Sequence, residues 1–224
     1  MLTVQLSSSA PPTDPVETFA GGHSYFRALK SAGHGHEFLT NRQSMGLRND
    51  RHRYGLVAQA LHWLVVIGIA LQFLWAWRID EAESIRQQFA LVNEHKSIGV
   101  TVLALVLIRI VWRLFNRPPP FPDSMSAWQR TAATSAHWGL YVLMLTLPVS
   151  GWAYSAAAGY GPEWFGWVDL PALFPTSERL EAIMYEVHKW TGRLLLALVA
   201  VHVLAVTQHA FIKKDGVWRR MWPG

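Results

Sequence analysis

The sequence predicts an all-α membrane protein, a four-transmembrane-helix bundle with both termini in the cytoplasm. The first observation is composition: charged residues make up 16% of the 224 residues, against about 25% in a typical soluble domain, and hydrophobic residues make up 51%. The second is the presence of four apolar segments long enough to cross a bilayer. The third is the placement of basic residues on alternate connections between these segments. The 12 Trp also suit a bilayer interface.

Composition also excludes several function classes. The chain has no Cys, which excludes disulfide frameworks, iron–sulfur clusters, thiolate metal sites and covalently attached haem. Metal chemistry would therefore rest on the 10 His and the carboxylates. The net charge of +5 could indicate nucleic-acid binding, but the basic residues flank apolar runs and form no patch interleaved with aromatic residues. We expect a lipid bilayer as the partner and no nucleic acid.

The first segment, residues 1–53, is rich in Ser, Pro, Gly, His and charged residues, and it lacks the apolar periodicity of a packed core. We expect a disordered polar tail. It does not resemble a signal peptide, because no adequate apolar stretch follows a basic start. Met45 opens the stretch "MGLRNDRHRYG", so translation that begins at Met45 is a further hypothesis. The bundle is expected over residues 54–213, and a basic cytoplasmic tail over residues 214–224.

The first two spans differ in clarity. No charged residue occurs from Tyr54 to Trp77, a stretch that exceeds the roughly 20 residues needed to cross the hydrocarbon layer. The second span is expected from about His95 to Trp112 and is interrupted by Arg109.

The third and fourth spans follow a stiff linker, "NRPPPFP". Between Arg130 and Glu163 lie 32 uncharged residues, and the apolar segment 137–160 within them is the third span. Pro148 is expected to kink or end its helix. The fourth span is expected over residues 194–212, with a helix that begins near residue 184. The connection 158–183 contains several aromatic residues and is expected to be an interfacial lid.

Charge assigns the orientation of the bundle. Basic residues lie before the first span, between the second and third spans, and after the fourth: Arg48, Arg51, Arg53, Arg113, Arg117, Arg130, Lys213, Lys214, Arg219 and Arg220. Acidic residues occupy the opposite connections: Asp80, Glu81, Glu83, Glu94, Glu163, Asp169, Glu178 and Glu181. By the positive-inside rule the basic ends are cytoplasmic. We expect a multi-pass protein of the bacterial inner membrane.

Histidines inside the spans are the most informative feature, because a polar side chain in the bilayer is costly unless it is paired. His188 and His202 are 14 residues apart in the fourth span. On an α-helix they project from nearly the same face, about 21 Å apart along the axis. One helix therefore presents two imidazoles at two depths.

Each of these imidazoles needs a partner at the same depth. His95 is level with His188 near the outer edge, and His62 is level with His202 near the inner leaflet. Two stacked bis-imidazole pairs in a four-helix bundle are what two b-type haems require. His137 lies at nearly the depth of His62, and spacing alone does not exclude it as a ligand. The remaining histidines are expected at the interface or in solvent: His209, His23, His34, His36 and His52.

Two glycines and an arginine accompany these histidines. The motif H-K-x-x-G occurs twice and places Gly99 and Gly192 one turn from His95 and His188. A missing side chain there leaves room for a flat macrocycle, although close helix packing explains these glycines equally well. Arg109 lies 14 residues after His95 and is expected to need an anionic partner, for which a haem propionate or a bound quinone are the candidates. Snorkelling towards the headgroups is the alternative.

The segments "QALHWLVVIGIALQF", "NEHKSIGVTVLALVLIRIVWRLFNRPPP", "HWGLYVLMLTLP" and "VHKWTGRLLLALVAVHVLAVTQHAF", followed by "RRMWP", resemble the four helices of the bacterial cytochrome b561 family. That family includes superoxide oxidase and is related to the b-type cytochrome subunits of nickel–iron hydrogenases. The resemblance covers about residues 50–223; the long N-terminal tail departs from it. It implies His62, His95, His188 and His202 as haem ligands, and a role beside the ligands or towards quinone for His137.

The expected function is transmembrane electron transfer through two non-covalent b-type haems. If both axial positions of each iron hold histidine, the haems carry electrons and do not bind oxygen. The resemblance implies superoxide as a periplasmic donor and ubiquinone as the acceptor, and the basic residues Lys96, Lys189 and Arg193 are consistent with an anionic donor. Two alternatives remain: an electron-transfer subunit that docks a dehydrogenase or hydrogenase, and a transporter whose histidines relay protons or metal ions without haem.

Overall fold

The computed structural model describes residues 46–161 and 163–222. The predictions for residues 1–45, which include the disordered tail and the start at Met45, lie outside these ranges. Four long helices dominate the described part: α2 (Leu56–Asp80), α3 (Ile85–Phe115), α4 (Ala127–Ala157) and α5 (Glu178–Thr207), the last continued by a π-helical turn, η1 (Gln208–Lys213). All four are long and apolar enough to cross a membrane, which confirms the predicted helical membrane bundle.

Three of the helices begin earlier than their apolar segments do. α3 begins ten residues before His95, where the hydroxyl of Ser84 accepts a hydrogen bond from the Gln87 amide. α4 begins after Ser126, which forms a capping box with Gln129. α5 begins after Ser177, whose side chain accepts from the Leu180 amide. Hydropathy detects the membrane-embedded turns, whereas polar caps set the true starts.

Pro148 does not end its helix. α4 runs through it to Ala157, because packing against neighbouring helices supports a proline-containing turn in a membrane segment.

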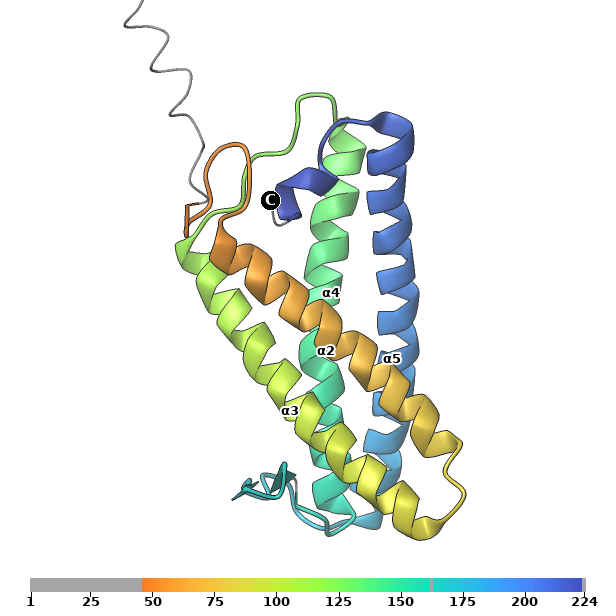
Figure 1. The fold of residues 1–224 in the computed structure, drawn as a ribbon. Coiled ribbons are helices and arrows are strands. Elements are labelled where there is room, and N and C mark those ends of the chain that lie inside the picture. The colour runs from red at the N-terminus through yellow and green to blue at the C-terminus, as the bar shows by residue number, and fades with distance from the viewer. Residues whose placement is uncertain (1–45, 162, 223–224) are drawn as a thin grey trace, which may run out of the picture. The chain divides into compact units, whose positions relative to one another are not determined.

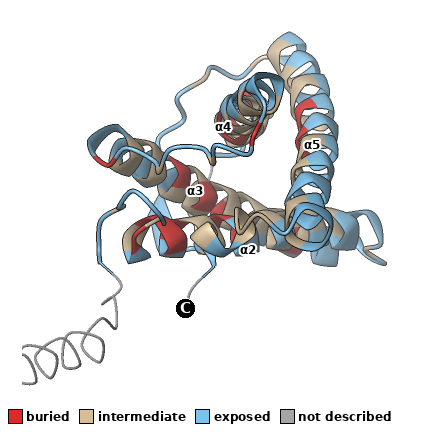
Figure 2. Ribbon diagram, turned by 90° about the horizontal axis from the view of Figure 1, so that it is seen from above, coloured by how far each residue is buried: buried red, intermediate tan, exposed pale blue. Residues whose placement is uncertain are grey.

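The helices associate as two pairs, α2 with α3 and α4 with α5, which meet mainly through α3 and α4 (Figure 1). Buried apolar side chains from all four helices form the core: Val65, Val102, Val106, Tyr141, Met144 and Leu195. Buried positions gather on α2, α3 and α4, and α5 is largely exposed (Figure 2). Its exposed residues include many large apolar side chains, as a lipid-facing surface requires.

We call the end of the bundle where α2 begins and α3 ends the inner end, and the opposite end the outer end, after the predicted orientation. At the outer end the strands β1 (Glu163–Trp164) and β2 (Val168–Asp169) pair antiparallel. This hairpin docks on α3: the Ser97 hydroxyl accepts from the Phe165 amide at 2.9 Å, and the Trp164 indole donates to the Thr101 hydroxyl at 3.0 Å. The segment predicted as a lid therefore contains a hairpin fixed to α3.

Both ends of the described chain are tied down at the inner end. The sequence placed residues 46–53 in the disordered tail, whereas here Asn49 donates to the carbonyl oxygens of Asn116 and Arg117. The C-terminal segment contains a short 3-10 helix, η2 (Trp218–Met221). The Arg220 carbonyl accepts from the Tyr54 amide at 3.1 Å, and the Met221 carbonyl accepts from the Trp63 indole at 3.0 Å. Residues 214–222 thus fold back onto the start of α2.

Candidate functional site

At the outer end, the structure brings His95 on α3 and His188 on α5 together. Their ring centroids are 6.3 Å apart, and the ring planes make an angle of 79°. Two imidazoles on opposite sides of one metal ion, with metal–nitrogen bonds of about 2 Å each, have centroids about 6 Å apart. The spacing of this pair therefore fits two axial ligands of one haem iron.

Hydrogen bonding defines the state of the His188 ring. Its Nδ1 lies 2.9 Å from the carbonyl oxygen of Leu147 on α4. A carbonyl oxygen can only accept, so Nδ1 carries the proton and Nε2 keeps the lone pair that binds a metal. The Nδ1 of His95, in contrast, is buried and has no hydrogen-bond partner among the described residues. The backbone carbonyl of His95 accepts from the Gln72 amide at 3.0 Å.

Three histidines gather at the second level, nearer the inner end. The rings of His137 and His202 have centroids 5.6 Å apart. His62 on α2 lies within electrostatic range of both, and its ring contacts Trp63. The predicted partner of His202 was His62, with His137 left open. Among the described residues the ring contact is between His137 and His202, whereas His62 lies within electrostatic range of both. The choice between His62 and His137 as the second ligand stays a prediction.

Arg109 is held by neutral acceptors. Its Nε donates to the Tyr141 hydroxyl at 3.2 Å, and its Nη1 donates to the Ala58 carbonyl at 3.0 Å. Within the described ranges no carboxylate lies within 4.0 Å of Arg109. A guanidinium has five N–H donors, so Arg109 has donors left for an anionic or carbonyl ligand.

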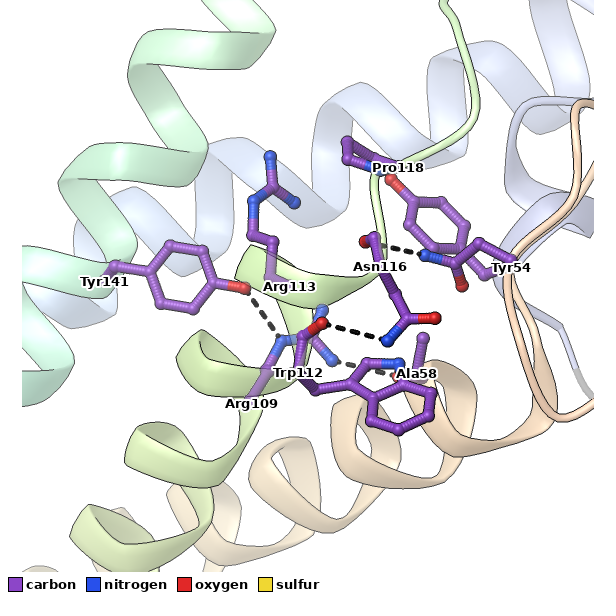
Figure 3. Close-up of a pocket in the computed structure, with 9 residues that line it drawn as sticks. Tyr54, Ala58, Arg109, Trp112, Arg113, Asn116, Pro118 and Tyr141 are labelled. Carbon is purple, nitrogen blue, oxygen red and sulfur yellow. Dashed lines mark hydrogen bonds between the residues drawn. The ribbon is translucent and has the colours of Figure 1, made fainter.

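A pocket surrounds this guanidinium at the inner end (Figure 3). Burial raises the pKa of Tyr54, so its hydroxyl keeps its proton at neutral pH. The Trp112 indole nitrogen is buried and has no hydrogen-bond partner in the part of the chain that the structure describes. The Arg113 guanidinium lies 5.9 Å from the centroid of the Tyr141 ring. No carboxylate lines the pocket, whose residues are Asn49, Tyr54, Ala58, Arg109, Trp112, Arg113, Asn116, Pro118 and Tyr141. Its donors suit a ligand with oxygen acceptors.

The two glycines of the repeated motif sit in different surroundings. A Cβ at Gly99 would lie 2.8 Å from the Gln72 side-chain nitrogen, so the space beside Gly99 holds an amide. A Cβ at Gly192 would meet a Leu147 methyl at 3.7 Å, an ordinary packing distance. Both glycines lie one turn from the outer histidines, and their role towards a macrocycle stays a prediction.

Several residues that contact the histidines belong to no motif in the sequence. Ser150 and Gly151 contact His188 from α4, and Gln72 contacts His95 from α2. These contacts depend on helix pairing, which periodicity does not specify. The Nδ1 of His209, expected at the interface, lies in hydrogen-bond contact with the Asp215 carboxylate at 2.5 Å. In the described residues no three or more histidine and carboxylate side chains converge on one point, whereas a haem iron needs only two axial ligands from the protein.

Comparison with known proteins decides the family. Residues 53–224 match the family described as prokaryotic cytochrome b561. The chain belongs to the prokaryotic cytochrome b561 family. It is 32% identical over 178 residues to cytochrome b561 homolog 2 of Escherichia coli. This match covers 79% of this chain and 95% of the relative. Cytochrome b561 homolog 1 of Escherichia coli is 27% identical over 177 residues, 77% of this chain and 98% of the relative.

A third relative, the probable superoxide oxidase CybB of Yersinia pestis, is 26% identical over 179 residues, 76% of this chain and 96% of the relative. Membership of the cytochrome b561 family implies membrane electron transport with b-type haem. The residues present fit such a group, because two facing imidazoles at the outer level have the spacing of axial ligands.

Proposed function

We propose that this cytochrome b561 carries electrons across the bacterial inner membrane from a periplasmic one-electron donor, superoxide, to quinone. In this proposal His95 and His188 hold an outer haem, and His202 holds an inner haem together with His62. Both termini are cytoplasmic. The observation that carries the proposal is the facing pair His95 and His188, contributed by two helices at the outer end.

A bound b-type haem supplies reversible one-electron oxidation and reduction of its iron. With two imidazoles on each iron, neither oxygen nor superoxide would have access to a coordination site. The chain's own contribution is to hold the imidazoles. At the outer level, the Leu147 carbonyl fixes the proton of His188 on Nδ1, which leaves Nε2 unprotonated as a ligand.

The outer connections are acidic overall, but one basic group beside an outer histidine, Lys96, favours an anionic donor. Lys96 directly follows His95, and its Nζ lies 3.5 Å from the Ser155 hydroxyl, with no carboxylate within 4.0 Å among the described residues. The charge of Lys189, in contrast, is paired with Glu186 at 2.5 Å. A cation without a carboxylate in direct contact attracts a small anion such as superoxide, and Glu163, within electrostatic range of Lys96, offsets part of this attraction. The relative from Yersinia pestis, named a probable superoxide oxidase, agrees with this donor.

The pocket around Arg109 supports a quinone at the inner end. Its donors, among them the Arg109 guanidinium and the Tyr54 hydroxyl, could bind a carbonyl oxygen of a quinone headgroup. The reaction balances when two superoxide anions each lose one electron and become oxygen. One quinone gains both electrons and takes up two protons from water, which gives the quinol.

Stopped-flow mixing of the purified, haem-loaded protein with superoxide and a water-soluble ubiquinone tests this function. We expect haem reduction, followed by quinol formation, both abolished by added superoxide dismutase. His95→Ala, which removes one proposed ligand, is expected to abolish quinol formation. A haem-loaded protein that superoxide does not reduce would contradict the proposal. Co-purification of such a protein with a dehydrogenase or hydrogenase would identify it as a docking subunit.

A further inference from the structure

We propose that the stretch Leu147–Gly151 of α4, which contributes no ligand, positions the imidazole of His188. This inference rests on the proposed role of His188 as an outer haem ligand. In it Leu147, Ser150 and Gly151 are positioning residues, each with a different contact to the ring. Together they fix the location, the tautomer and the electron density of one of the two outer imidazoles.

The first contact is the hydrogen bond from His188 Nδ1 to the Leu147 carbonyl oxygen, at 2.9 Å. A ligating histidine that donates its other N–H to a carbonyl is held in one orientation and becomes a more basic ligand. A more basic ligand favours the oxidised iron, so this bond is expected to lower the reduction potential of the outer haem.

The second contact is made by Gly151, which has no side chain between its backbone and the ring. A Cβ at this position would lie 2.9 Å from His188 Cε1 and 3.1 Å from Nδ1. The ring of a free histidine could swing aside at small cost, but a ring that binds iron on its opposite side cannot. Gly151 therefore provides the space that the ligated imidazole occupies.

The third contact is the hydroxyl of Ser150, a side chain that is 3% exposed. Its Oγ lies 2.8 Å from the Leu147 carbonyl oxygen and 3.3 Å from His188 Nδ1. The hydroxyl and the imidazole thus donate to the same carbonyl oxygen. The Nδ1 proton of His188 is also within reach of the Ser150 hydroxyl oxygen as a second acceptor. Because the proton is shared between two acceptors and the carbonyl oxygen between two donors, Ser150 weakens the bond that the carbonyl makes to His188.

The other outer histidine lacks this arrangement, since the Nδ1 of His95 is buried and has no hydrogen-bond partner within the described ranges. One face of the outer haem would then see an imidazole with enhanced basicity and the other face an ordinary imidazole. The α4 stretch is accordingly expected to adjust the potential of the outer haem through His188.

Redox titration of the two haems, combined with their low-spin electron paramagnetic resonance spectra, tests the inference in three proteins: wild type, Gly151→Ala and Ser150→Ala. Gly151→Ala crowds the ligated ring and weakens its hydrogen bond to the Leu147 carbonyl, so the outer potential is expected to rise. Ser150→Ala leaves the carbonyl to His188 alone, so the outer potential is expected to fall. These shifts in potential are read on the scale of the reduction equilibrium constant. A tenfold change in that constant corresponds to about 59 mV, and a threefold change therefore corresponds to about 30 mV. The inner haem is the internal control.

Two matched variants complete the design. Gly139→Ala, in the same helix, would place a Cβ 3.1 Å from a Leu198 methyl and away from His188. Thr131→Ala removes a hydroxyl that donates to the Ala127 carbonyl of the same helix. Neither is expected to shift the outer potential.

The outcomes separate the two proposals. Opposite shifts in Gly151→Ala and Ser150→Ala support the inference, because general loosening of the helix would move both the same way. Loss of only the outer haem in Gly151→Ala also supports the inference, and the shift in outer potential is then measured in Ser150→Ala. An unchanged or raised outer potential in Ser150→Ala overturns the inference while the proposed function stands. Absence of b-type haem from the wild-type protein overturns the proposed function itself.

Discussion

At the scale of single residues, the two histidine levels differ in how well the structure defines them. The outer level contains two imidazoles and no third candidate among the described histidines. We expect His95→Ala and His188→Ala to lose the same haem and to retain the other, because each variant removes one of two axial ligands. The haem content per chain and the splitting of the α-band in the reduced spectrum show which haem each variant loses. Loss of different haems in the two variants would contradict the outer pair.

The inner level requires a choice between two partners for His202. The family resemblance favours His62, whereas the ring in contact with His202 is that of His137, at 5.6 Å. We predict that His62→Ala loses the inner haem, as His202→Ala does, and that His137→Ala retains it. Haem quantification after purification distinguishes the variants. Retention of both haems in His62→Ala, with loss in His137→Ala, would make His137 the ligand.

Some of the residue-level site could be predicted from sequence, and some could not. The 14-residue spacing of His188 and His202 depends only on the helical repeat, so it is visible in the sequence. The contact of Gly151 with His188 joins two helices, and the side-chain amide of Gln72 reaches α3 from α2. Neither contact leaves a signal in local spacing, because each depends on which faces pair in three dimensions.

At the scale of elements, close approach of α2 and α3 depends on Gly68. A Cβ there would lie 2.5 Å from a Val102 methyl, and Val102 belongs to the core. Gly68→Ala is expected to cost about 1–3 kcal/mol of stability through overpacking, seen as a lower thermal midpoint in detergent. The double variant Gly68→Ala with Val102→Ala should be less destabilised than the sum of the single variants. Simple additivity would show that this contact does not limit the packing.

Element boundaries show where sequence reasoning reached its limit. The apolar runs located all four spans, but the starts of α3, α4 and α5 depend on Ser84, Ser126 and Ser177, whose polar caps lie outside those runs. The β1–β2 hairpin is fixed by the long-range contacts of Ser97 and Thr101 on α3. Short strands with such anchors have no periodic pattern of their own.

At the scale of the whole molecule, charge placement makes a prediction about the donor. If superoxide is attracted by the outer end, Lys96→Gln is expected to slow haem reduction by a few-fold at low ionic strength and to weaken its salt dependence. Lys189→Gln is the matched control, because the charge of Lys189 is already paired with Glu186. Stopped-flow rates over a series of salt concentrations measure both variants. Equal effects of the two substitutions would argue against a specific role for Lys96.

The central claim is that one chain holds two b-type haems, each between two histidines. The haem-to-protein ratio of the purified chain, from its reduced-minus-oxidised visible spectrum, tests this claim most directly. The account predicts a b-type α-band and two haems per chain. A ratio of one haem per chain, or a spectrum without a b-type band, would contradict it.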